Sequence, residues 1–157
     1  MTGFRRGVRL GVDVGKARVG ISRCDPDGML AVPVETVPRS DASLARIAEI
    51  ASEYEPLEFV VGLPVNMQGA ETPSTADARE FAAALQELTS IPVRLMDERL
   101  STVSAHAALR SSGRTQRNSR SIVDQVAAVV LLQHAIDTEK STGSPAGVLV
   151  PRAEEPI

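Results

Sequence analysis

A chain of 157 residues with 43% hydrophobic content is long enough for one well-buried core and short for two, which predicts a single globular domain. The net charge of −3 excludes a strongly basic molecule, so nucleic-acid binding would depend on local clusters of cations. The lone Cys24 excludes an intramolecular disulfide, and no amino-terminal apolar run has the length of a signal or membrane segment. We therefore expect a cytoplasmic protein with no membrane contact.

The first predicted elements are two strands within residues 8–23, joined by a glycine-bounded turn. In the first strand Leu10 and Val12 alternate with small or polar residues, so the apolar side chains share one face and Asp13 lies on the other. An acid at a strand end among small neighbours is well placed to hold a metal ion or a phosphate. It is equally compatible with a turn-forming acid that bonds to nearby backbone.

The middle of the chain alternates helices with strands. A third strand at 30–37 completes an antiparallel meander, and a helix is predicted over about 41–55. The near-continuous apolar run at 57–62 is typical of a central strand buried on both faces. A loop at 63–73, rich in turn residues, precedes a helix at 74–88, and loops in this position commonly line sites in α/β sheets.

Two further acids follow the strand predicted at 91–96. Asp97 and Glu98 are neighbours, so their side chains point to opposite faces and only one can share the face of Asp13. The spacing leaves open which one does. One acid could instead cap the following helix, which is expected to end at about Leu109, or balance Arg99 on the surface.

The last predicted helix, over 121–139, carries the most informative acid. Asp124 lies on a stripe of small and apolar residues, where a carboxylate is costly unless it is paired or metal-bound. The alternative is a capping box with Ser121 at the start of the helix. The preceding residues 111–120 are polar, and we expect them to form a mobile loop.

The order of these elements is that of a ribonuclease H-like α/β domain. We expect a mixed five-stranded sheet, built from the three-strand antiparallel meander plus parallel strands and flanked by helices. The domain is predicted to cover residues 1–139, and residues 140–157 to form a flexible carboxyl-terminal tail.

Acids on the first strand, at a later strand end and on the last helix can converge at one edge of such a sheet. Hard oxygen ligands of this kind select Mg²⁺ or Mn²⁺, and two such ions about 4 Å apart would promote phosphodiester cleavage. The polar segment before the last helix supplies cations that could grip phosphates, or that could merely keep a loop solvated. These cations are Arg110, Arg114, Arg117 and Arg120. With no Trp, one Tyr and three Phe, we expect recognition of backbone or junction shape rather than base stacking.

Four segments of the chain carry a resemblance to a known family. They are GVDVGKARVGIS (11–22), VVGLPVNMQGAE (60–71), DERLST (97–102) and DQVAAVVLLQ (124–133). In order and spacing the chain resembles the YqgF family, also called RuvX-like proteins, a ribonuclease H-like group associated with precursor 16S rRNA processing and related to Holliday-junction resolvases.

The resemblance implies that Asp13, Glu98 and Asp124 are catalytic and metal-binding acids, with Asp97 in a supporting position. It also implies that the loop at 63–69 forms a wall of the substrate cleft. Within this cleft we expect polar or charged contacts to nucleic acid, in addition to the four arginines above, from Lys16, Arg18, Asn66 and Arg99. The chain departs from the family at one point, because it reads Lys16-Ala17-Arg18 where many members read Thr-Lys-Arg.

The implied activity is that of a hydrolase acting on ester bonds, a Mg²⁺- or Mn²⁺-dependent nuclease that processes the 5′ end of precursor 16S rRNA in ribosome biogenesis. One alternative is a Holliday-junction resolvase acting on branched DNA as a homodimer, since a four-way junction presents two symmetry-related strands. A non-catalytic scaffold that binds RNA or the ribosome is a second alternative. A kinase or ATPase of the actin and sugar-kinase type also carries Asp-x-Gly after its first strand, but this chain is too short for its two lobes.

Overall fold

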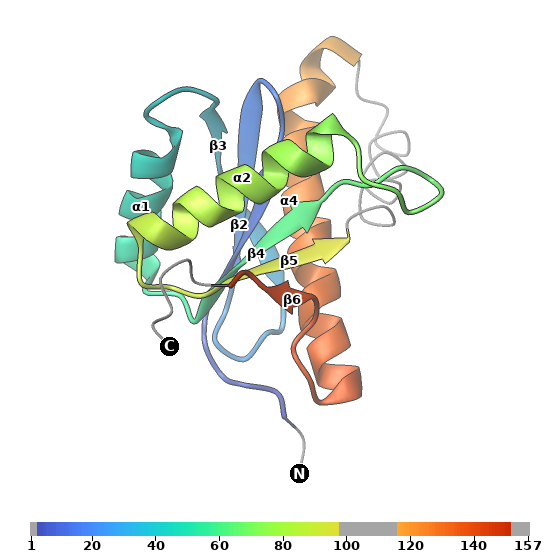
Figure 1. The fold of residues 1–157 in the computed structure, drawn as a ribbon. Coiled ribbons are helices and arrows are strands. Elements are labelled where there is room, and N and C mark those ends of the chain that lie inside the picture. The colour runs from blue at the N-terminus through green and yellow to red at the C-terminus, as the bar shows by residue number, and fades with distance from the viewer. Residues whose placement is uncertain (1–2, 98–115, 152–157) are drawn as a thin grey trace, which may run out of the picture.

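The computed structural model describes residues 3–97 and 116–151, with side chains in the second range from residue 125 onward. A six-stranded mixed sheet lies between α1 and α2 on one face and α4 on the other (Figure 1). The strands are β1 (Arg9–Val14), β2 (Arg18–Cys24), β3 (Ala31–Pro38), β4 (Glu58–Leu63), β5 (Val93–Asp97) and β6 (Val148–Leu149). The helices are α1 (Ser43–Tyr54), α2 (Pro73–Leu88) and α4 (Gln116–Thr142). Within the described residues no helix has both the length and the apolar content needed to cross a membrane.

The sheet has the order β3-β2-β1-β4-β5-β6. The first three strands pair antiparallel as a meander, whereas β1 pairs with β4 and β4 with β5 in parallel. Parallel neighbours need a crossover connection, and α1 and α2 provide the two crossovers over the same face. The mixed α/β fold predicted from the sequence is confirmed, with six strands in place of five.

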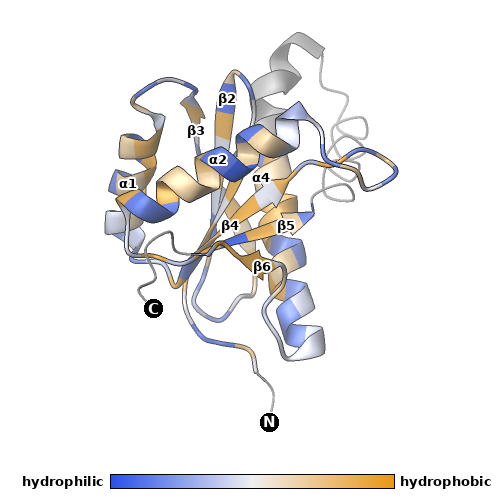
Figure 2. Ribbon diagram, in the orientation of Figure 1, coloured by the Kyte–Doolittle hydropathy of each residue, from blue (hydrophilic) through white to orange (hydrophobic). Residues whose placement is uncertain are grey.

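Strand alternation divides the interior into two cores, one on each face of the sheet. Leu10 and Val12 of β1 pack in the cluster that contains α1 and α2. Val60 of β4 and Met96 of β5 point the other way and pack with Leu131 of α4. Figure 2 shows the hydrophobic residues concentrated along the central strands between the helical layers.

The sixth strand comes from the segment predicted to be a tail. α4 continues to Thr142, past the predicted domain end at residue 139, and the chain then turns so that β6 pairs antiparallel with β5. Gly147 permits this turn, because its φ is +78° and a Cβ there would lie 2.3 Å from the carbonyl oxygen of Leu95. A two-residue strand is too short to show alternation in the sequence, so the prediction of a tail from residue 140 was wrong for residues 140–150. The end of that tail, 152–157, lies outside the described residues.

The start of α4 also differs from the prediction. The helix begins at Gln116 rather than at 121, so the last five residues of the predicted loop 111–120 are helical. Gln and Arg are good helix formers, and polarity alone does not prevent a helix. Ser121 consequently lies inside the helix, and the capping-box explanation of Asp124 was wrong. The helix predicted to end at about Leu109 lies outside the described residues.

Candidate active site

Asp13 lies near the carboxyl end of β1, on the face of the sheet that α4 covers. Two residues that share this face by alternation both contact α4. Arg9 donates from Nη2 to Oε2 of Glu139 at 3.1 Å, and a Cβ on Gly11 would lie 2.9 Å from the carbonyl oxygen of Ala128. The earlier strand residue, Arg9, contacts the later helix residue, Glu139, and the later strand residue, Gly11, lies against the earlier helix residue, Ala128. α4 therefore runs antiparallel to β1. The start of α4 therefore lies near the end of β1 that carries Asp13, which is half-buried.

A hydrogen bond near the start of α4 shows which turn of the helix lies level with Asp13. Gln125 donates from Nε2 to Oγ1 of Thr36 on β3 at 2.8 Å. Thr36 and Asp13 lie in one row across the sheet, because both pair with the same residue of β2. The backbone of Asp124, next to Gln125, therefore lies at the level of this row. The side chain of Asp124 lies outside the described set.

The second predicted acid follows the end of β5. Asp97 is the exposed last residue of β5 and pairs with Leu63 at the end of β4. Since β1, β4 and β5 are parallel, their carboxyl ends meet at one edge of the sheet. The strand end that leads into Glu98 thus lies at the same edge as Asp13, with β4 between them. Glu98 itself begins the range outside the described residues.

The loop after β4 is folded on itself by one side chain. Oδ1 of Asn66 accepts hydrogen bonds from the backbone N–H groups of Gln68 and Ala70, at 3.0 and 2.9 Å. Arg79 of α2 donates from Nη2 to Glu71 at 2.6 Å, and this hydrogen bond lowers the pKa of the Glu71 carboxyl. The exposed Asn66 therefore shapes the loop through its oxygen, a role that the sequence did not reveal.

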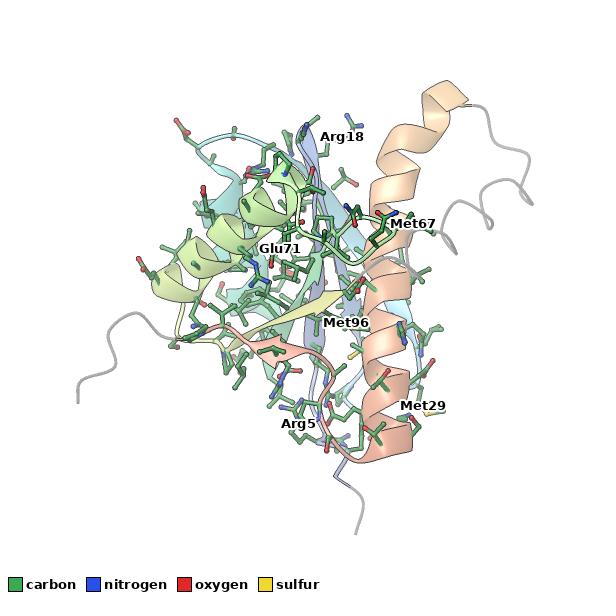
Figure 3. The ribbon with its side chains drawn as sticks, turned by 45° about the vertical axis from the view of Figure 1, so that its right-hand side comes forward. Arg5, Arg18, Met29, Met67, Glu71 and Met96 are labelled. Carbon is green, nitrogen blue, oxygen red and sulfur yellow. The ribbon has the colours of Figure 1, made fainter. Side chains whose placement is uncertain are left out.

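The predicted cationic contacts occupy two places. Lys16 is exposed in the turn between β1 and β2, and Arg18 is partly buried at the start of β2. Figure 3 shows Arg18 and the loop residue Met67 at the end of the molecule away from Arg5. Two more lie on the first turns of α4, with side chains outside the described set, namely Arg117 and Arg120. The others lie outside the described residues, namely Arg99, Arg110 and Arg114.

Two residues beside the turn between β1 and β2 were not predicted from the sequence. Arg39 follows β3 and binds Asp77 of α2 through two hydrogen bonds of 2.9 and 2.8 Å. The hydrogen bond from Arg39 is the main cause that lowers the pKa of the Asp77 carboxyl, and the charge of Lys16 acts in the same direction. The two residues are 38 positions apart with no motif between them, so no sequence signal pointed to their contact.

The donor chemistry fits a hard divalent cation. The carboxylate of Asp13 supplies oxygen ligands at a strand end, the kind that Mg²⁺ and Mn²⁺ prefer. Among the side chains that the structure describes, no three or more His, Cys, Asp or Glu form a metal-binding group. Two of the three predicted ligands, Glu98 and Asp124, lie outside that set, so the proposed metal centre stays a prediction. His134 is exposed on α4 and takes part in no such group among the described residues.

Sequence comparisons identify close relatives. The family model RuvX, described as Holliday junction resolvase, matches residues 7–138. A protein of Clavibacter michiganensis is 58% identical over 152 residues, covering 95% of this chain and 94% of the relative. A protein of Streptomyces coelicolor is 50% identical over 92% of this chain and 88% of its own length. Both carry the name "Putative pre-16S rRNA nuclease".

Two solved structures of RuvC from Thermus thermophilus share the architecture. One, in complex with a Holliday junction substrate, has a TM-score of 0.56 and 18% identity, and covers 88% of this chain and 98% of RuvC. The other has a TM-score of 0.54 and 19% identity. Identity this low shows the ribonuclease H-like fold alone. The match over residues 7–138 and the relatives that share at least half of their residues show that the chain belongs to the RuvX family.

Proposed function

We propose that this protein is a metal-dependent phosphodiester nuclease that processes the 5′ end of precursor 16S rRNA. The observation that carries the proposal is the register of α4 against the sheet. The proposal is supported because, in this register, the backbone of Asp124 lies level with Asp13, at the edge where β5 leads into Glu98. The substrate class follows from the shared name of the relatives.

In this proposal Asp13, Glu98 and Asp124 hold the metal. When bound, two Mg²⁺ or Mn²⁺ ions would supply an activated water and a stabilised leaving oxygen. At Asp13 the contribution of the chain is to fix the acid on a paired strand before the substrate arrives. Asp13 pairs with Gly20 of β2, and the preceding residue Val12 is paired on both sides, with β2 and with β4, so the strand holds the backbone of Asp13 in place before binding.

Basic residues near the acids would hold the substrate phosphates. Arg120 and Arg117 precede Asp124 by four and seven residues, so they continue its helical stripe beyond the edge of the sheet. Lys16 and Arg18 lie at the same end of β1 and β2. We include in this contact set the remaining predicted residues, Asn66, Arg99, Arg110 and Arg114. The lone cysteine agrees with a reducing, cytoplasmic location for this activity.

Junction resolution is the second candidate, favoured by the description of the family model. A resolvase cuts two symmetry-related strands, so this function would require a homodimer with two copies of the site. Ribosomal RNA processing makes no such demand. The oligomeric state during the reaction therefore separates the two candidates.

The test compares cleavage of a labelled precursor 16S rRNA fragment and of a synthetic four-way DNA junction, each with Mg²⁺ or Mn²⁺. We expect Asp13→Asn to lower the rate by more than about 100-fold, beyond the usual effect of residues that only support a metal ligand. Asp137→Asn makes the same change on an exposed turn of α4 and should leave the rate unchanged. Equal cleavage by the wild type and Asp13→Asn would contradict the proposed mechanism. Normal rRNA maturation with all three acids neutralised would favour a scaffold.

A further inference from the structure

Arg39 joins three segments of the chain at the turn that follows Asp13. Its Nη1 donates to the carbonyl oxygen of Gly15 at 2.9 Å, and its backbone N–H donates to that of Ala17 at 2.9 Å. The guanidinium also binds both carboxylate oxygens of Asp77 on α2, at 2.9 and 2.8 Å. One residue therefore ties the turn of residues 15–18 to α2.

The turn itself is closed tightly. The backbone N–H of Gly15 donates to the carbonyl oxygen of Arg18 at 2.9 Å, and a Cβ on Gly15 would lie 2.7 Å from that oxygen. The turn starts two residues after Asp13 and directly follows the end of β1. Its conformation is fixed on the inside by this hydrogen bond and on the outside by Arg39.

The surroundings of Arg39 oppose its movement. The guanidinium lies over the ring of Phe81 with 5.0 Å between Cζ and the ring centroid, and only 24% of its side chain is exposed. A cleft of about 700 Å³ opens beside it, and Lys16 and Asp77 both line this cleft. With its carboxylate bound by Arg39 in two places, Asp77 is less able to attract the neighbouring ammonium group of Lys16.

We propose that Arg39, held by Asp77, is a positioning residue that fixes the turn, and with it Lys16, at the end of β1 where a nucleic acid would be bound beside Asp13. This inference rests on the proposed function and adds a specific binding role for the turn. Arg39 acts on the turn through its hydrogen bond to the backbone of Gly15 and by binding the carboxylate of Asp77. It takes no part in the chemistry itself.

The first test is a binding cycle without divalent ions, so that no strand is cut. Fluorescence anisotropy gives the Kd of a labelled four-way DNA junction and of a precursor 16S rRNA fragment. We expect Lys16→Ala to weaken binding about tenfold, as for loss of one hydrogen bond to a charged group. Arg39→Ala should weaken it by a similar factor, and the double variant should bind no worse than either single variant. Multiplication of the two factors, or normal binding by Arg39→Ala, would overturn the proposal.

The second test observes the turn directly. The Gly15 amide should exchange its hydrogen at least about tenfold faster in Arg39→Ala, because the outer support of the turn is gone. Arg46→Ala is the matched control, since Arg46 also binds a carboxylate in two places, that of Glu35, at 2.9 and 2.6 Å on another part of the surface. It should leave both exchange and binding unchanged. Unchanged exchange in Arg39→Ala would refute the positioning role.

A charge swap separates positioning from ordinary stabilisation. Arg39→Asp combined with Asp77→Arg restores an ion pair but places no guanidinium beside Gly15. We expect the urea midpoint to recover and the Kd to remain raised, whereas full recovery of binding would overturn the proposal. The nuclease assay fails or succeeds independently of these results. A wild type that binds both probes but cuts neither would contradict the nuclease alone, and one that binds neither would contradict both proposals.

Discussion

A buried ion pair lies at the end of the sheet opposite Asp13. The side chains of Arg9 and Glu139 are only 2% and 3% exposed. Arg5 donates to both oxygens of Glu139 and also binds Glu58, so each charge has a partner. Burial raises the pKa of the Glu139 carboxyl, but hydrogen bonds from the side chain and backbone of Arg5 and the charges of both arginines outweigh it. The resulting pKa is about 2, below the usual 4.5.

This shift predicts how stability depends on pH. Between pH 4.5 and 2 the unfolded chain binds more protons at residue 139 than the folded chain does. The contribution of Glu139 is therefore complete above pH 4.5 and is lost as the pH falls toward 2. In urea unfolding, Glu139→Gln should cost about 3 kcal/mol at pH 7, because Arg9 would stay buried without its charged partner. The variant should also lose less stability than the wild type between pH 5 and pH 3.

Glu49→Gln is the control for this prediction. Glu49 binds Arg46 at 3.0 Å, but its side chain is 69% exposed. Water screens such a pair, so the change should cost less than about 0.5 kcal/mol. A Glu139→Gln variant with the acid profile of the wild type would show that the buried pair does not cause the loss of stability.

At the scale of elements, one side chain of α2 joins β5 to the segment that follows β6. Gln86 is 4% exposed, and its Nε2 donates to the carbonyl oxygen of Val150 at 2.7 Å. Its Oε1 accepts a hydrogen bond from the backbone N–H of Val93 at 3.0 Å. The same two residues also bond directly, from the N–H of Val150 to the carbonyl oxygen of Val93 at 2.8 Å. The amide of Gln86 therefore completes the pairing at this edge of the sheet.

Replacing Gln86 with Leu tests this connection. The new side chain has a similar size but leaves the N–H of Val93 and the carbonyl oxygen of Val150 without their amide partner. We expect a loss of about 2 kcal/mol in urea unfolding and faster hydrogen exchange at the Val93 amide. Glu87→Leu adds the same side chain at the next, exposed position and should change stability by less than about 0.5 kcal/mol. Equal effects of the two substitutions would exclude the connection.

The elements that sequence predicts well are those with a clear hydrophobic period. The alternation of Leu10 and Val12 placed Asp13 on the opposite face of β1, and the structure puts these two residues in the core shared with α1 and α2. β6 has two residues and no period, so pairing with β5 is visible only in three dimensions. The first turns of α4 are polar, and polar residues are common both in loops and on exposed helix turns.

The candidate site likewise contains features that local sequence predicts and features that it does not. The position of Asp13 followed from local alternation, whereas the contact between Arg39 and Asp77 depends on how α2 packs beside the β1–β2 turn. No local sequence pattern indicates how these elements pack. The assignment of Glu98 over Asp97 rests on the family resemblance and stays a prediction, because Glu98 lies outside the described residues.

At the scale of the whole molecule, the distribution of charge matters more than its sum. A net charge of −3 repels a polyanion at long range, so we expect binding to depend on a local group of cations. In our proposal these include Arg117 and Arg120 at the start of α4. At the other end, the exposed Arg6 pairs with Asp27 at 2.8 Å, beside the buried network of Arg5. In our proposal, therefore, the arginines at the start of α4 bind phosphates, whereas Arg6 at the other end is already paired with a carboxylate.

A matched pair of substitutions tests this local attraction. Arg120→Ala and Arg6→Ala each remove one positive charge, so both change the net charge from −3 to −4 (−3 − 1 = −4). If Arg120 contacts a phosphate, its loss should reduce the slope of log K against log salt concentration for the DNA junction by about 0.9. Arg6→Ala should leave this slope unchanged, because its charge is already paired far from the site. Equal changes in the two variants would show that nucleic acid responds to the net charge of the molecule and that no phosphate site exists at the start of α4.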